Sequence, residues 1–262
     1  MKTFRYLILL IIISISCSAP PEKKVRVVKP DNFKSENLNR LHFFFKRSEL
    51  DSIKAKNVIE KHRIIQHLSH LKKMDNGGKK YYLLEKDNIT EMIRSVTEGI
   101  YLDYILINKH GEIVYTRNNE ELFGSNINEG YDSPLKKCFL NRGNVFFEDV
   151  SFILPNSKVY CLQISSPVFV EKDFHGILVL QVEIKKINEI LDTGTEIFSR
   201  DGIIRVTPFN DRIFSKYTGY ENLKMTGLEN NNPVYFKLPE GKIRFSGFNY
   251  KEIIWIVAQK EG

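Results

Sequence analysis

The sequence is poor in cysteine, and it lacks the short motifs of the common enzyme classes. With 3 Cys in 262 residues, neither a framework of several disulfides nor a zinc site with four cysteine ligands can form. No Gly-x-Ser-x-Gly, His-Glu-x-x-His, Walker or dinucleotide-binding motif occurs. We therefore expect a protein that is not an enzyme and that uses neither a metal nor a cofactor.

Neither positive nor negative charge is concentrated in one segment of the sequence. The 39 basic and 32 acidic residues are interspersed and give a net charge of +7. A nucleic-acid-binding stripe is therefore not predicted. With 42% apolar residues, 15 Gly and 9 Pro, the composition is that of an ordinary globular protein rather than a disordered or fibrous one.

Long apolar runs are confined to the N-terminus. Lys2 and Arg5 precede the run Tyr6–Ile13, which is shorter than the roughly 20 residues of a membrane-spanning helix. A basic start followed by a short apolar run and small residues is typical of a secretory signal peptide. We assign residues 1–17 to this signal.

The end of the signal resembles a bacterial lipobox, because a small residue directly precedes Cys17. Ser14 departs from that motif, since it stands where a large aliphatic residue is usual. We predict that Cys17 is acylated and anchors the protein to a membrane on the extracytoplasmic side. Cleavage after Ser16 without lipid and an uncleaved anchor are the alternatives.

Two helical segments are predicted before the first strand. Residues 18–31 are rich in Pro and basic side chains and read as a tether. From Asn32 to Lys73 there is neither Pro nor Gly, and apolar residues form a loose helical stripe. Asp87 or Asn88 can cap a second helix that reaches Gly99. Residues 32–99 are thus an N-terminal helical region.

The periodicity then changes to that of strands, in two similar series. The first, residues 100–191, predicts strands at Tyr104–Lys109, Glu112–Arg117, Val145–Phe152, Val159–Val170 and Gly176–Glu183, with helices at Pro134–Leu140, capped by Ser133, and Lys185–Leu191. The second, residues 192–262, predicts strands at Glu196–Ser199, Ile203–Thr207, Val234–Leu238, Lys242–Phe248 and Ile253–Gln259. Two antiparallel sheets, each with a helix or loop layer, make an internal repeat in an α+β fold.

The ordered series of motifs resembles the double-Cache sensor domain, a PAS-like extracellular region of chemotaxis receptors and sensor kinases. The resemblance rests on Tyr104–Thr116 with Leu122–Asn126, then Phe147–Asp149, Ile164–Phe169, Gly176–Val182 and Thr193–Glu196 with Asp201–Arg205. It implies two PAS-like modules braced by a long N-terminal helix, and ligand sensing rather than catalysis.

Receptors of this kind continue into a second membrane helix, whereas this sequence stops at Gly262 directly after the last predicted strand. We therefore expect a lipid-anchored sensor module without its own output domain, which passes its signal to a transmembrane receptor or another envelope protein. The alternative is a structural or protein-interaction lipoprotein without a small ligand. Polar groups that converge on a cavity in residues 100–184 would favour sensing, and a cavity filled by Phe146, Phe147, Phe152 and Phe169 would favour the structural role.

Asp149 is the predicted charged anchor of a small-molecule site in the first module. Alternation along Phe146–Phe152 places it on one face with Phe147 and Ser151. If buried, its carboxylate needs a partner, either Arg117, Arg142 or a ligand cation. The same site would be completed by Tyr115, Arg117, Tyr131, Gln163 and Ser165.

Two further features carry weaker expectations. Cys138 and Cys161 could pair as a disulfide outside the cytoplasm or stay free, because the sequence does not give their distance. The single tryptophan, Trp255, is expected in the core of the second module.

Overall fold

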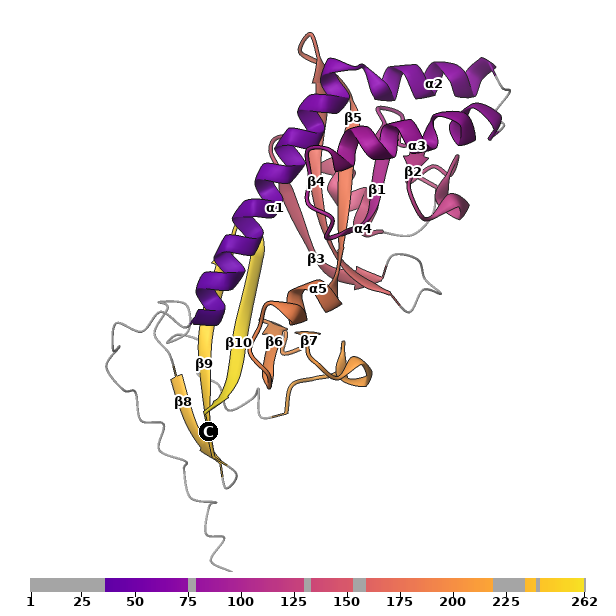
Figure 1. The fold of residues 1–262 in the computed structure, drawn as a ribbon. Coiled ribbons are helices and arrows are strands. Elements are labelled where there is room, and N and C mark those ends of the chain that lie inside the picture. Colours follow the sequence, from indigo (N-terminus) through magenta and orange to yellow (C-terminus); the bar gives the residue numbers. More distant parts are fainter. Residues whose placement is uncertain are drawn as a thin grey trace, which may run out of the picture.

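The computed structural model describes residues 36–74, 79–129, 133–152, 159–218, 234–238 and 241–261. The predicted signal peptide with Cys17 and the tether of residues 18–31 lie outside the described residues. The described part is built from an N-terminal set of helices followed by two antiparallel sheets (Figure 1).

The described part of the N-terminal region contains three helices, where the sequence predicted two. They are α1 (Glu36–Lys61), α2 (Ile64–Met74) and α3 (Lys80–Arg94). The long predicted helix is broken at Arg63, which adopts a left-handed backbone with φ of 49° and donates its N–H to the Glu60 carbonyl at 3.1 Å. A left-handed residue of this kind ends a helix and turns the chain. Neither Gly nor Pro marks the break, so the sequence did not reveal it.

The predicted start of the second helix, at Asp87 or Asn88, is wrong. Both residues lie inside α3, which begins at Lys80. The buried residues Tyr82, Ile89 and Ile93 share one face of this helix, at spacings of seven and four that fit the helical period. Because Tyr82 is buried, α3 begins before Asp87 and Asn88, the two residues that the sequence suggested as its cap.

The first sheet carries helices on both faces. Its strands lie in the order β2-β1-β5-β4-β3. Helices α1, α2 and α3 pack on one face, and the short helix α4 (Pro134–Leu140) packs on the other. The predicted cap of α4 is confirmed, because Ser133 Oγ accepts the Lys136 N–H at 3.2 Å. The strand bounds are β1 (Tyr101–Asn108), β2 (Ile113–Thr116), β3 (Phe146–Phe152), β4 (Tyr160–Val170) and β5 (Asp173–Glu183).

The second sheet repeats the first. After α5 (Ile184–Glu189), its strands are β6 (Thr195–Ser199), β7 (Ile204–Val206), β8 (Val234–Leu238), β9 (Gly241–Tyr250) and β10 (Ile253–Glu261), in the order β7-β6-β10-β9-β8. This order matches that of the first sheet strand for strand. Short 3-10 turns, η1 (Glu120–Leu122) and η2 (Asn210–Arg212), follow the second strand of each sheet. The predicted α+β fold with two PAS-like modules is confirmed.

The first turn of each sheet repeats at the level of single hydrogen bonds. Gly111, with φ of 84°, donates its N–H to the Asn108 carbonyl at 2.9 Å. Gly202, with φ of 78°, bonds in the same way to the Ser199 carbonyl at 2.9 Å. Positive φ is the reason for glycine at both turns.

Helix α1 runs beside both sheets and joins them (Figure 1). Phe45, at its centre, is fully buried. Its ring centroid lies 5.4 Å from that of Phe147 in β3, and 5.2 and 5.4 Å from those of Phe248 and Trp255 in the second sheet. The predicted bracing by a long N-terminal helix is therefore confirmed, with Phe45 at the junction.

Polar contacts hold α1 at the same junction. Glu49 accepts hydrogen bonds from the Tyr250 hydroxyl at 2.5 Å and from the Lys251 ammonium at 2.6 Å. Partial burial opposes ionisation of Glu49, but the hydrogen bonds from Lys251 and Tyr250 outweigh it and lower the pKa of the carboxyl. The ionised Glu49 carboxylate therefore stabilises the contact between α1 and the second sheet at neutral pH. This contribution is lost as the pH falls through the lowered pKa of Glu49.

Candidate functional site

Four polar side chains lie in register across the face of the first sheet that α4 covers. Asp103 in β1 pairs with Gln181 in β5, Gln181 pairs with Gln163 in β4, and Gln163 pairs with Glu148 in β3. Directly paired residues on one face of a sheet have neighbouring side chains. We call Asp103, Gln181, Gln163 and Glu148 the polar row.

The Asp103 end of the polar row is fully satisfied within the protein. The carboxylate of Asp103 is buried and accepts from Thr116 Oγ1 at 2.8 Å and Asn119 Nδ2 at 2.6 Å. It also accepts the backbone N–H groups of Arg117 at 2.7 Å and Asn118 at 3.1 Å. Asp103 thus fixes the chain where β2 leaves the sheet, which is a structural role.

The opposite end is held by α4. Glu148 accepts from Lys137 of α4 at 2.8 Å, and its side chain is only 13% exposed. Cys138, the next residue of α4, points its Sγ toward Gln163 Oε1 at 3.9 Å. The helix therefore covers the row directly.

The centre of the polar row is less well satisfied. Gln163 Nε2 donates to Ser151 Oγ at 3.4 Å, a long hydrogen bond. Gln181 is fully buried, and neither its Oε1 nor its Nε2 has a hydrogen-bond partner among the described residues. An unpaired buried amide is costly, by about 1–3 kcal/mol per group, and a group of this kind in a native fold calls for an explanation.

The rest of the space below α4 is apolar. A buried cluster joins the sheet to α4 and the preceding loop, and it consists of Ile105, Ile107, Ile113, Ile127, Leu135, Cys138, Phe139, Ile177 and Val179. The packing of four phenylalanines was expected to distinguish a sensing role from a structural one. Of these four, only Phe146 packs against this cluster. Phe147 faces α1, Phe152 is 40% exposed, and Phe169 reaches the edge of the cluster only through its contact with Phe174.

Tyr115 and Arg117, two of the predicted ligand residues, belong to the opposite face of the sheet. Tyr115 is fully buried, and its hydroxyl lies 2.6 Å from Thr90 Oγ1 in α3. Burial raises the pKa of the Tyr115 phenol to about 12. The Arg117 guanidinium lies over the Tyr104 ring, 5.4 Å from its centroid, and donates to the Tyr101 carbonyl at 3.2 Å.

Asp149, the predicted anchor, lies at the contact between the two modules. Its Oδ2 accepts from Ser199 Oγ at 2.8 Å and Arg205 Nε at 3.1 Å, and its Oδ1 accepts from Trp255 Nε1 at 2.9 Å. The expected pairing with Arg117 or Arg142 is therefore corrected to Arg205 of β7.

The cause of this difference is a β-bulge. The register between β3 and β4 shifts between Glu148 and Ser151, so strict alternation fails over this stretch. Phe147 faces α1, whereas Ser151 faces Gln163. Asp149 lies within the bulge and contacts the second sheet, whereas Glu148 faces α4.

The structure brings two of the predicted ligand residues together, Gln163 and Ser165. They lie two residues apart on β4, both buried, on the side of α4. Tyr131 lies outside the described residues. A contact with a ligand stays a prediction for all six residues.

Cys138 and Cys161 are free and buried, so the disulfide is not formed. Cys138 faces Gln163, two residues along β4 from Cys161. Burial raises the pKa of each thiol to about 12, which keeps both protonated and unreactive at neutral pH.

Sequence reasoning missed Asp103, Glu148 and Gln181. Asp103 directly precedes an apolar strand, and Gln181 interrupts one between Leu180 and Val182. A polar residue inside such a run was the available signal, because buried polar side chains need partners.

Comparisons with known proteins agree with this architecture. No protein-family model matches the sequence, and neither does any curated protein. Among solved structures, an extracellular ligand-binding receptor from Desulfohalobium retbaense superposes with a TM-score of 0.61 at 11% identity, over 85% of this chain and 38% of that one. This chain therefore spans well under half of that receptor's length.

Two smaller domains match nearly end to end. The ligand-binding domain of the Pseudomonas fluorescens chemoreceptor CtaA, in complex with L-valine, has a TM-score of 0.54 at 10% identity, over 87% of this chain and 93% of that one. A domain of a sensory box/GGDEF family protein from Vibrio parahaemolyticus has a TM-score of 0.51 at 12% identity, over 86% and 97%. This chain therefore shares its fold with these ligand-binding and sensory domains.

Proposed function

We propose that this protein is an extracytoplasmic sensor module that binds a small molecule in its first module, at the polar row below α4. The fold, shared with ligand-binding domains, supports binding rather than catalysis. The observation that carries the proposal is Gln181, whose amide is fully buried and has no described partner. Such an amide offers one acceptor and two N–H donors to a bound molecule.

The chemistry of the polar row sets the class of ligand. Asp103 and Glu148 are already occupied by protein donors, so Gln181 and Ser165 supply the unpaired polar groups, and Gln163 adds an amide held only by long contacts. They favour a small uncharged or zwitterionic molecule that carries both donors and acceptors. The apolar cluster around Phe139 and Ile177 would enclose its apolar part.

A thermal-shift screen of the purified protein against amino acids, including L-valine and L-alanine, and other small metabolites tests this proposal. A ligand at 100 times its dissociation constant stabilises the folded state by about 2.7 kcal/mol. For a chain of this size that corresponds to a rise in Tm of about 5–11 °C.

Gln181→Leu is expected to abolish the ligand-induced rise while leaving the free protein as stable as the wild type or more so. Leucine is close to glutamine in volume and removes two unpaired polar atoms from the interior. Gln259→Leu in β10 is the matched control, because Gln259 donates to Asp192 at 3.3 Å in the second module. A full ligand shift in Gln181→Leu would contradict the site.

The packing below α4 favours a second candidate, a structural or protein-interaction lipoprotein. Leu135, Phe139 and Phe146 pack closely against the sheet there. If no compound in the screen raises Tm, and Gln181→Leu stabilises the protein, the polar row is a structural irregularity and this second function is favoured.

We further propose that the protein is lipid-anchored at Cys17 and acts beside a transmembrane receptor or another envelope protein. Within the described residues, none of the helices combines the length and apolar character needed to cross a bilayer. The motif that precedes Cys17 supports acylation.

Cys17→Ala is expected to shift the protein from the membrane fraction to the soluble fraction, or to block its maturation, because several acyl chains are needed for stable anchoring. Membrane fractionation with mass spectrometry of the N-terminus measures this. A variant that stays membrane-bound and is processed as before would rule out the lipid anchor.

A further inference from the structure

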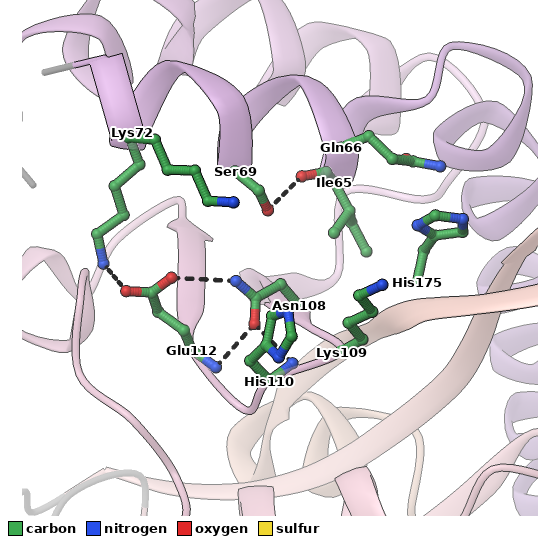
Figure 2. A pocket seen from close by; sticks show the side chains of 10 residues that line it. Ile65, Gln66, Ser69, Lys72, Asn108, Lys109, His110, Glu112 and His175 are labelled. Carbon is green, nitrogen blue, oxygen red and sulfur yellow. Dashed lines mark hydrogen bonds and ion pairs between the residues drawn. The ribbon is translucent and has the colours of Figure 1, made fainter.

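A hollow lies at one end of the first sheet, away from the polar row. It has a volume of about 510 Å³ and lies between α2, the β1–β2 turn and the start of β5. Figure 2 shows Gln66 and Ser69 of α2 on one side and Lys109, His110 and His175 on the other. His175 and Gln181 are six residues apart on β5, about 20 Å along the strand, so the two sites are separate.

The lining of this hollow is basic. Lys72, Lys73 and Lys109 contribute three positive charges, and Glu112 contributes one negative charge, which gives +2 with neutral histidines. His110 and His175 add two further N–H groups. None of Lys73, Lys109, His110 and His175 forms an ion pair with a residue that the structure describes.

The acid in the lining is already neutralised. Glu112 pairs with Lys72, whose side chain is only 12% exposed, and its other oxygen accepts from Asn108 Nδ2 at 3.0 Å (Figure 2). Asn108 Oδ1 in turn accepts the N–H groups of His110 at 3.0 Å and Glu112 at 3.1 Å. This network fixes the turn and leaves Lys73 and Lys109 to attract an anion.

Helix α2, which carries Lys72 and Lys73, also contributes acceptors. Ser69 Oγ donates its hydrogen to the Ile65 carbonyl at 2.7 Å, so its remaining lone pairs can only accept. Gln66 Oε1 is buried and has no hydrogen-bond partner among the described residues. Gln66 and Ser69 both belong to the lining of the hollow (Figure 2). Their natural partners are O–H or N–H donors.

We propose that this hollow binds a small hydroxylated anion, of the sugar phosphate or sugar acid class. Its anionic group lies against Lys73, Lys109 and the histidines, and its hydroxyl groups donate to Gln66 and Ser69. A volume of 510 Å³ is in the range of small-molecule sites. The site is independent of the polar row and of the function proposed for it.

Isothermal titration calorimetry of the purified protein at low salt tests this site with three probes. Glucose 6-phosphate is expected to bind with a dissociation constant of about 1 mM or tighter. Inorganic phosphate is expected to bind more weakly, and glucose not at all. Glucose binding as tightly as glucose 6-phosphate, or neither phosphate compound binding in this range, would overturn the proposal.

Two variants separate the charged groups of the site from its acceptor on α2. Lys73→Gln/Lys109→Gln is expected to weaken glucose 6-phosphate binding by about tenfold or more, because each lysine is a charged donor to the anion. Gln66→Leu is expected to remove most of the advantage of glucose 6-phosphate over phosphate, with phosphate binding unchanged. The control is Lys185→Gln, an exposed lysine of α5 far from the hollow.

Unchanged affinity in the double lysine variant would place the anion elsewhere and reject the site. Gln181→Leu in the same titration is expected to bind glucose 6-phosphate like the wild type. The anion site and the polar row can therefore fail separately.

Discussion

Phe45→Ala is expected to destabilise the protein by about 3–5 kcal/mol, the usual cost of truncating a buried phenylalanine. Phe45 is fully buried and contacts aromatic rings of both sheets, at centroid distances of 5.2–5.4 Å. Its removal leaves a cavity that neither sheet can fill alone. In a chain of this size we expect Tm to fall by about 6–20 °C.

Thermal unfolding followed by circular dichroism measures this effect. Phe43→Ala is the matched control, because Phe43 lies on the same helix but is 66% exposed. The control should change stability by less than about 0.5 kcal/mol. If the two variants lose similar stability, α1 is not the element that joins the modules.

The strands were predictable because their apolar residues are dense and their turns carry glycine. The two series of strands, the helix Pro134–Leu140 and its cap at Ser133 all follow from such local signals. The break between α1 and α2 was not predictable, because Arg63 holds a left-handed conformation without a glycine. Tertiary packing determines it: the chain must turn so that α2 can cover the end of the first sheet (Figure 1).

The candidate site was less predictable than the fold, because a sheet places side chains by register and not by sequence alone. One inserted residue reverses the faces of all residues beyond it. The bulge between Glu148 and Ser151 did this to Ser151, which faces Gln163 while Phe147 faces α1, and the predicted anchor Asp149 lies within the bulge itself. Gln163 and Ser165, on a regular part of β4, lie on the predicted side of the sheet, whereas the long-range partners of Asp149 could not be read from the sequence.

Asp149→Ala is expected to destabilise the protein by about 2–3 kcal/mol. It removes the acceptor of the buried Trp255 N–H and one partner of Arg205, whose side chain is 16% exposed. Breaking a fully buried pair costs about 3–5 kcal/mol, and the lower figure here allows for Asp149 itself, whose side chain is 32% exposed. Urea unfolding at pH 7 measures the loss.

Asp201→Ala is the matched control, because Asp201 pairs with the same guanidinium at 2.8 Å but is 50% exposed. Exposed pairs contribute about 0–1 kcal/mol. Because Asp149 and Arg205 contact each other directly, their alanine variants should be non-additive by at least about 0.5 kcal/mol in a double-mutant cycle. Additive losses, or an Asp149→Ala variant as stable as Asp201→Ala, would contradict the role of Asp149 in joining the modules. The expected result is a loss of stability in Asp149→Ala but not in Asp201→Ala, together with faster hydrogen exchange in β6 and β10. That result would show that the contact between the two sheets is what Asp149→Ala weakens.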